Sequence, residues 1–138
     1  MYRLAMGLVG NDYDAADAAQ EAICKAYARL ETLRRPEQFR PWLLRILTNE
    51  CYEILRQRQR YAETEAIPEG EAPPPEPSPV WQAVCDLNEQ MRAVVILYYY
   101  EGFQSREIAA ILHLSDATVK ARLSRARKRL REMLEGSL

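Results

Sequence analysis

The sequence predicts an all-α protein in which two small helical domains are joined by a linker. Apolar residues recur every three or four positions along most of the chain, which is typical of amphipathic helices, and no stretch alternates as a half-buried strand would. Residues 61–79 interrupt this pattern with six prolines, five glutamates and no basic residue. Prolines and like charges predict an extended, hydrated linker there, with no helix. The predicted domains are therefore residues 1–60 and 80–138.

The first two helices of the first domain are expected on either side of Gly10. An apolar stretch, Met1–Val9, precedes this glycine. Asp12 or Asp14 then caps a helix that runs to about Leu33, because short acidic residues suit the positive N-terminal end of a helix. The residues at helical spacing that are expected to form its buried face are Ala15, Ala19, Ala22, Ile23, Ala26, Tyr27 and Leu30.

A third helix is expected to complete this domain. It runs from about Pro41, a residue that suits a first helical turn, to Arg60, and its last residues are basic. Apolar residues at helical spacing predict one buried stripe along it. This stripe is formed by Trp42, Leu43, Ile46, Leu47, Tyr52 and Leu55.

The second domain is expected to begin with two helices. The first starts at Pro79 or Val80, since proline suits the beginning of a helix. The second is opened by Asn88, a preferred N-cap residue, and ends at Gly102. The apolar residues of these two helices are Trp81, Val84, Cys85, Leu87, Met91, Val94, Val95, Leu97 and Tyr98.

The end of the chain predicts a helix-turn-helix. Ser105 is expected to cap a short helix, Arg106–Leu112, and Ser115 a long one that runs from Asp116 to about Glu135. Between them, His113 lies where the turn needs a left-handed backbone, a conformation that histidine tolerates better than most residues. A short helix, a tight turn and a long basic helix are typical of this DNA-binding motif.

The long helix has an apolar back and a basic front. Its inward stripe is formed by Val119, Leu123, Ala126, Leu130 and Leu134. The opposite face carries Ala117, Lys120, Ala121, Ser124, Arg125 and Lys128. Residues 120–131 hold seven basic residues and no acidic one, which points to a polyanionic partner even though the net charge of the chain is −1. Small residues among the cations allow the helix backbone to approach base edges in the major groove.

Several function classes are disfavoured by the composition. Three separated cysteines (Cys24, Cys51, Cys85) and one histidine offer neither a disulfide framework nor a metal site. No nucleophile–base pair or phosphate-binding loop is present, so we expect neither catalysis nor a cofactor. No apolar run approaches the roughly 18 residues that cross a bilayer, and the first residues do not resemble a signal peptide, which predicts a cytoplasmic protein without membrane insertion.

Three segments, in order, resemble bacterial sigma-70-type factors of the extracytoplasmic-function (ECF) group. Residues 14–21 (DAADAAQE) resemble the core-polymerase-binding helix of sigma region 2, and residues 39–50 (FRPWLLRILTNE) resemble the promoter-melting helix that follows it. Residues 102–109 (GFQSREIA) and 115–127 (SDATVKARLSRAR) resemble the helix-turn-helix of sigma region 4. The resemblance implies region 2-like and region 4-like modules, and a factor that binds core RNA polymerase and promoter DNA and is regulated by an anti-sigma protein.

The resemblance also implies roles for individual residues. It assigns core-polymerase binding to Asp14, Asp17, Gln20 and Glu21, although acidic residues near a helix N-terminus can also simply offset the helix dipole. It assigns contacts with minus-ten DNA to the loop 34–39 and to Asn49, Glu53, Arg56 and Arg60. Arg56, Arg58 and Arg60 suit phosphates, whereas Trp42 suits the core better than base stacking. It assigns contacts with minus-thirty-five bases to Lys120, Ala121, Ser124 and Arg125, and contacts with the DNA backbone to Thr118 and Arg122.

Two alternative functions stay open at this stage. A sigma-like decoy or adaptor would bind an anti-sigma protein without productive DNA contact, and the basic front of residues 120–131 argues against it. A dimeric helix-turn-helix transcriptional regulator would need neither the polymerase-binding helix nor the long linker.

Overall fold

The computed structural model describes residues 1–64 and 78–136, and within them the backbone forms helices and turns without a strand. The chain divides into two compact units, Met1–Pro73 and Pro74–Leu138. The predicted all-α fold with two helical modules is therefore confirmed. Most of the predicted linker, residues 65–77, lies outside the described residues. Residues 61–64, the first four of the predicted linker, are the end of a helix that runs to Thr64. This differs from the prediction, because the first proline comes only at Pro68.

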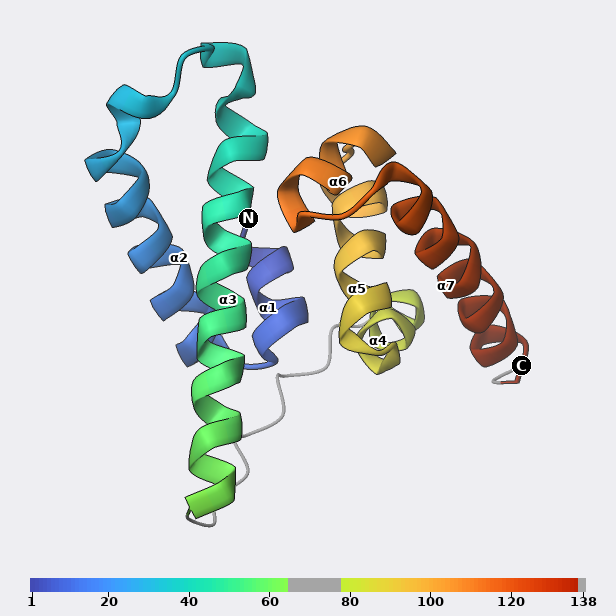
Figure 1. Cartoon of the computed structure of the whole chain (residues 1–138). Helices are drawn as coiled ribbons and strands as arrows, with labels where there is room; N and C mark the ends of the chain where they lie inside the picture. The colour runs from blue at the N-terminus through green and yellow to red at the C-terminus, as the bar shows by residue number, and fades with distance from the viewer. Residues whose placement is uncertain (65–77, 137–138) are drawn as a thin grey trace. The chain divides into compact units, whose positions relative to one another are not determined.

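The first unit is built from α1 (Tyr2–Val9), α2 (Asp12–Ala28) and α3 (Phe39–Thr64). Two short 3₁₀ turns, η1 (Leu30–Thr32) and η2 (Pro36–Gln38), connect α2 to α3. In Figure 1, α2 and α3 lie side by side and α1 lies beside the middle of α3, in agreement with the contacts among the three helices.

The boundaries of α1 and α2 depend on two local features. Gly10 has a φ of 82°, a left-handed conformation that ends α1 and that glycine adopts without strain. Asn11, rather than Asp12 or Asp14, is the N-cap of α2, since its Oδ1 accepts a hydrogen bond from the Asp14 amide at 2.8 Å. Asparagine and aspartate are equally suitable caps, so composition does not distinguish between these positions.

The buried face of α2 is a stripe of alanines, and the predicted face was partly wrong. Ala15, Ala18, Ala22 and Ala26 are buried, and their small side chains allow a close approach of α3. In contrast, Ile23, Tyr27 and Leu30 are 54%, 82% and 48% exposed. Helical spacing allows either stripe, and the packing of α2 on α3 selects the alanines. Leu30 also lies beyond the end of α2.

The middle of α3 supplies the rest of this core. Leu44, Leu47 and Cys51 are buried, as is Thr48, whose hydroxyl donates a 2.7 Å hydrogen bond to the Leu44 carbonyl. Of the predicted stripe, Ile46 and Leu47 are buried, whereas Trp42, Leu43, Tyr52 and Leu55 are half-buried. Burial, with a smaller contribution from the neighbouring Glu50, raises the pKa of the Cys51 thiol to about 12.

The second unit consists of α4 (Pro79–Asp86), α5 (Glu89–Val95), a π-helical turn η3 (Ile96–Tyr100), α6 (Ser105–Leu112) and α7 (Asp116–Gly136). Helices α4, α5 and α6 all contact α7. The buried core of this unit includes Trp81, Val94, Leu97, Ile108 and Ile111, together with Val119 and Leu123 of α7. The predicted inward stripe of α7 is thus confirmed in its first half, while Leu130 and Leu134 are half-buried.

Most predicted helix boundaries in this unit are confirmed. Asn88 accepts from the Met91 amide at 2.9 Å and Ser115 from the Thr118 amide at 3.1 Å. His113 is left-handed, with a φ of 57°. The prediction for α6 was wrong by one residue: Gln104 is its N-cap, and Glu107 reaches back to accept from the Gln104 amide at 3.0 Å, so Ser105 is the first helical residue.

Candidate interfaces for nucleic acid and a protein partner

The outward face of α2 is a polar surface that carries exposed aromatic side chains. Asp17, Gln20 and Glu21, three of the residues predicted to bind a partner, are exposed. At 100° per residue, this face lies opposite the buried alanines and also includes Tyr13 and Tyr27, each 82% exposed. Exposed tyrosines are more common at protein–protein interfaces than on the rest of a protein surface.

Asp14, the fourth predicted residue of this set, belongs to the internal structure of the unit. Its carboxylate accepts hydrogen bonds from the Arg58 guanidinium and, at 3.1 Å, from the Asn11 side chain. Arg58 also donates to the Val9 carbonyl at 2.7 Å, and so connects all three helices. Partial burial alone would raise the pKa of Asp14, but the hydrogen bonds from Arg58 and Asn11 and the charge of Arg58 together lower it. The prediction of Arg58 as a phosphate contact therefore finds no support.

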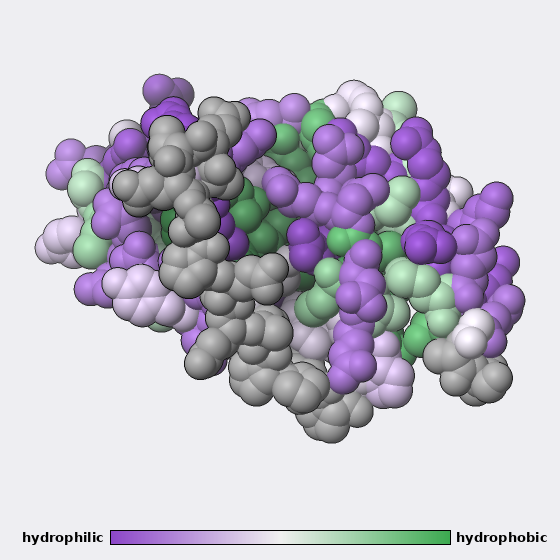
Figure 2. All heavy atoms as spheres, turned by 90° about the horizontal axis from the view of Figure 1, so that it is seen from below, coloured by the Kyte–Doolittle hydropathy of each residue, from purple (hydrophilic) through white to green (hydrophobic). Residues whose placement is uncertain are grey.

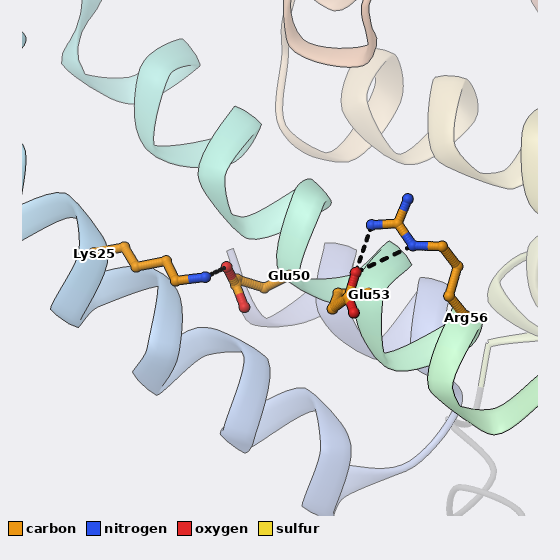
Figure 3. Close-up of polar contacts among 4 residues, drawn as sticks. All are labelled: Lys25, Glu50, Glu53 and Arg56. Carbon is orange, nitrogen blue, oxygen red and sulfur yellow. Dashed lines mark hydrogen bonds and ion pairs between the residues drawn. The ribbon is translucent and has the colours of Figure 1, made fainter. Parts of the chain in front are cut away.

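A polar groove runs between α2 and α3 (Figure 3). Lys25 of α2 forms an ion pair with Glu50 of α3, which raises the pKa of Lys25 through their hydrogen bond. One turn further along α3, Arg56 donates to Glu53 Oε2 from Nε at 3.2 Å and from a terminal nitrogen at 2.7 Å. The groove is lined by Lys25, Arg29, Ile46, Asn49, Glu50, Glu53 and Arg56.

This groove brings together three of the four residues predicted for minus-ten DNA. Asn49, Glu53 and Arg56 are spaced four and three residues apart, so they lie on one face of α3, and Arg60 follows four residues later. The amide, the carboxylates and the cations offer both donors and acceptors to a base edge, and Ile46 supplies an apolar floor. At the start of α3, Phe39 is exposed, and its ring lies 6.0 Å from that of the half-buried Trp42.

The basic front of α7 is exposed, as predicted. Lys120, Ser124 and Arg125 are exposed, and Ala121, Arg122 and Thr118 are half-buried. Lys120 pairs with Asp116 at 3.0 Å, and hydrogen bonds from Ser105 and Lys120 lower the pKa of Asp116. In Figure 2, hydrophilic side chains gather over the C-terminal part of α7 at the right of the view.

Residues 1–64 and 78–136 contain no group of three or more metal-ligating side chains. Within the same ranges, none of the helices is both long and apolar enough to cross a membrane.

Comparisons with known proteins identify both units. The family model of sigma-70 region 2 matches residues 1–61, and that of sigma-70 region 4 matches residues 79–130. The sigma factor SigV of Bacillus subtilis is 34% identical over 96% of this chain and 83% of its own length. The ECF sigma factor SigW of the same organism is 30% identical over 97% of this chain and 82% of its own length. This chain belongs to the ECF group of the sigma-70 family.

Other relatives of this sigma factor include a longer protein and two solved structures. A probable sigma factor, RfaY of Xanthomonas campestris, is 36% identical, and this chain spans only 36% of its length. Among solved structures, the sigma factor RpoE in complex with the anti-sigma factor NepR, from Bartonella quintana, has a TM-score of 0.81 and 29% identity over 97% of this chain and 89% of that one. CnrH in complex with the cytosolic domain of CnrY has a TM-score of 0.72 and 26% identity over 99% of this chain and 81% of that one.

Sequence reasoning missed the part of the sigma factor's groove that α2 supplies. Lys25 and Arg29 are basic residues at the end of a largely acidic helix, a charge asymmetry visible in the sequence, but their pairing with α3 depends on tertiary packing. Tyr13 and Tyr27 were missed as surface residues, since Tyr27 was assigned to the core. The signal that could have found them is their 14-residue separation, which returns them to the same side of α2.

Proposed function

We propose that this chain joins core RNA polymerase through the outward face of α2 and directs it to promoters through α3 and α7. The observation that carries the proposal is the exposure, in separate units, of two different surfaces. The first is an acidic and aromatic face that suits a protein partner, and the second is a basic helix front that suits a DNA groove. A factor that recruits an enzyme to DNA needs both.

The polymerase-binding surface in this proposal consists of Tyr13, Asp17, Gln20, Glu21 and Tyr27. Asp14 is left out, because its carboxylate is engaged with Arg58. Exposed carboxylates and an amide between two tyrosines fit a basic, partly apolar partner surface such as a helix of the polymerase.

The minus-ten surface in this proposal is the groove between α2 and α3, with Asn49, Glu53 and Arg56 facing an unstacked base and Arg60 near its phosphates. Unstacking a base costs a few kcal/mol, which donors, acceptors and an apolar floor can offset. Arg56 already pairs with Glu53, so DNA must compete with this internal contact.

The minus-thirty-five surface in this proposal is the front of α7. Lys120, Ala121, Ser124 and Arg125 face the bases, and Thr118 and Arg122, at the edge of the front, face the backbone. An anti-sigma protein is a further partner, since the structural relative RpoE was solved with the anti-sigma factor NepR. The proposal includes no catalytic step or cofactor, and it places the chain in the cytoplasm with the polymerase.

Reconstitution tests this function. The purified chain is mixed with core polymerase and genomic DNA fragments, and the 5′ ends of the transcripts are mapped. We expect discrete start sites that are absent with core alone. A chain that never joins core would support the decoy or the dimeric regulator instead, and sequence-specific binding to DNA without core would favour the regulator.

A further inference from the structure

Arg127 of α7 lies on two exposed tyrosines of the π-helical turn η3. Its Nε donates a hydrogen bond to the Tyr99 hydroxyl at 2.6 Å. Its guanidinium carbon lies 5.6 Å from the ring centroid of Tyr98 and 5.7 Å from that of Tyr99, within the range of a cation–π interaction. The two rings meet edge to face, 4.9 Å apart. We name Tyr98 and Tyr99 together the tyrosine shelf.

The π-helical turn explains why both tyrosines face outward. The Glu101 amide bonds to the carbonyl of Ile96, five residues back, at 3.0 Å. Ile96 and Leu97 are buried, and Tyr100 packs edge-on against Trp81 with ring centroids 5.2 Å apart. Tyr98 and Tyr99, between these inward residues, remain 37% and 53% exposed. Single π turns inside helices are often found at functional sites.

Arg127 occupies one edge of the basic front of α7. Counting 100° per residue, it lies near Arg131 and further from the centre of the front than the base-facing Lys120 and Ser124. Arg122 lies on the other edge. A helix about 10–12 Å across fills a major groove about 12 Å wide, so its two edges face the two phosphate walls.

We propose that Arg127 contacts a DNA phosphate and that the tyrosine shelf holds its guanidinium ready for this contact. The proposal rests on the DNA-binding role of α7 proposed above and adds a residue outside the set assigned to either DNA element. A guanidinium has five N–H donors, more than the two tyrosine hydroxyls can occupy, so donors remain for a phosphate. A side chain already ordered by the shelf loses less conformational freedom on binding.

The test measures promoter binding by the holoenzyme, with a fluorescent duplex that contains a start site mapped by reconstitution, across a series of salt concentrations. We expect Arg127→Gln to weaken binding about three- to tenfold at 0.1 M salt and to lower the magnitude of the log–log salt slope by about one. The loss of affinity should be the same on promoters with substituted bases. Arg127→Lys should keep the slope.

The shelf is tested by a double-mutant cycle. Tyr98→Leu with Tyr99→Leu should weaken binding while keeping the salt slope, and should have little further effect once Arg127 is Gln. Tyr99→Phe keeps the ring, loses the hydrogen bond and should have a smaller effect. Thermal melting by circular dichroism identifies the variants that fold. If the double leucine variant does not fold, Tyr99→Phe and Arg127→Lys still test the proposal.

Three results would overturn this inference. The first is an unchanged affinity and slope for Arg127→Gln. The second is additive losses in the cycle. The third is a shelf variant that weakens assembly with core polymerase but not DNA binding, which would make the tyrosines a protein interface. A wild-type holoenzyme that assembles but binds no promoter would instead contradict the proposed function itself.

Discussion

The guanidinium of Arg58, near the end of α3, pairs with the carboxylate of Asp14, in the first turn of α2. Forty-four residues separate the two in sequence. The same guanidinium holds the last carbonyl of α1, at Val9, so one side chain joins the ends of all three helices. Asp14 therefore contributes to the stability of the first unit, whereas Tyr13 and Asp17 on the same helix are exposed.

We expect Asp14→Asn to lower the free energy of unfolding of the first unit by about 1–2 kcal/mol at pH 7, because it removes a charged, half-buried hydrogen-bond partner. The folded-state pKa of Asp14 lies below its ordinary value of 3.8. The stabilisation is therefore fully present above that value and disappears as the pH falls through the lowered pKa. Urea unfolding of the wild type and of Asp14→Asn, from pH 7 downwards, measures whether their free energies of unfolding become equal as the pH falls.

Asp17→Asn is the matched control for Asp14→Asn. Asp17 is exposed on the same helix, so we expect its substitution to leave stability unchanged and to weaken core binding. Equal stability of the Asp14 variant and the wild type at pH 7 would contradict the structural role of the Arg58–Asp14 pair.

The exposed face of α2 predicts a strong effect of Tyr27→Ala on polymerase assembly. Removing an exposed aromatic anchor from an interface costs about 1–3 kcal/mol of binding free energy, and Tyr27 makes no contribution to the core. Fluorescence titration with core polymerase measures the loss. Val80→Ala, an exposed apolar residue of the second unit, serves as the control and should bind core normally. Equal affinities of the two variants would remove Tyr27 from the proposed interface.

The cysteines predict a footprint of the same surface. Cys24 is exposed on α2 between Gln20 and Tyr27, whereas Cys51 is buried with a pKa of about 12. At pH 8 we expect a thiol reagent to modify Cys24 rapidly and Cys51 only after unfolding, since the thiolate is the reactive form. Peptide mass spectrometry distinguishes the sites. Core polymerase should protect Cys24, and full labelling of Cys24 in the holoenzyme would place the interface elsewhere.

Arg125 and Arg122 are expected to act differently on promoter DNA. Arg125→Ala should cost about 1–3 kcal/mol on the preferred minus-thirty-five sequence and little on others, because it removes a base contact. Arg122→Ala should weaken binding uniformly, as the loss of a phosphate contact does. Competition binding with holoenzyme on a panel of substituted promoters separates the two patterns. A uniform loss for Arg125→Ala would reassign it to the backbone.

Local signals in the sequence predicted much of the second unit. Asn88, Ser115 and His113 act through hydrogen bonds and backbone angles within a few residues, so their roles do not depend on the rest of the fold. The basic front of α7 was also predictable, because charged side chains stay solvated wherever a helix packs. The error at the start of α6 reflects competition between two adjacent polar residues, Gln104 and Ser105, for one cap position.

The sequence by itself determined that this chain forms helices, where most of them begin and end, and that its last helix presents a basic front. Only the tertiary structure decided which stripe of α2 is buried, that Lys25 meets Glu50 across a groove, and that Asp14 is occupied by Arg58. The physical reason is the distance in sequence over which each interaction acts. Caps and turns depend on neighbours in the chain, whereas burial and ion pairing depend on which helix face meets another helix, and α2 offered two apolar stripes of equal period.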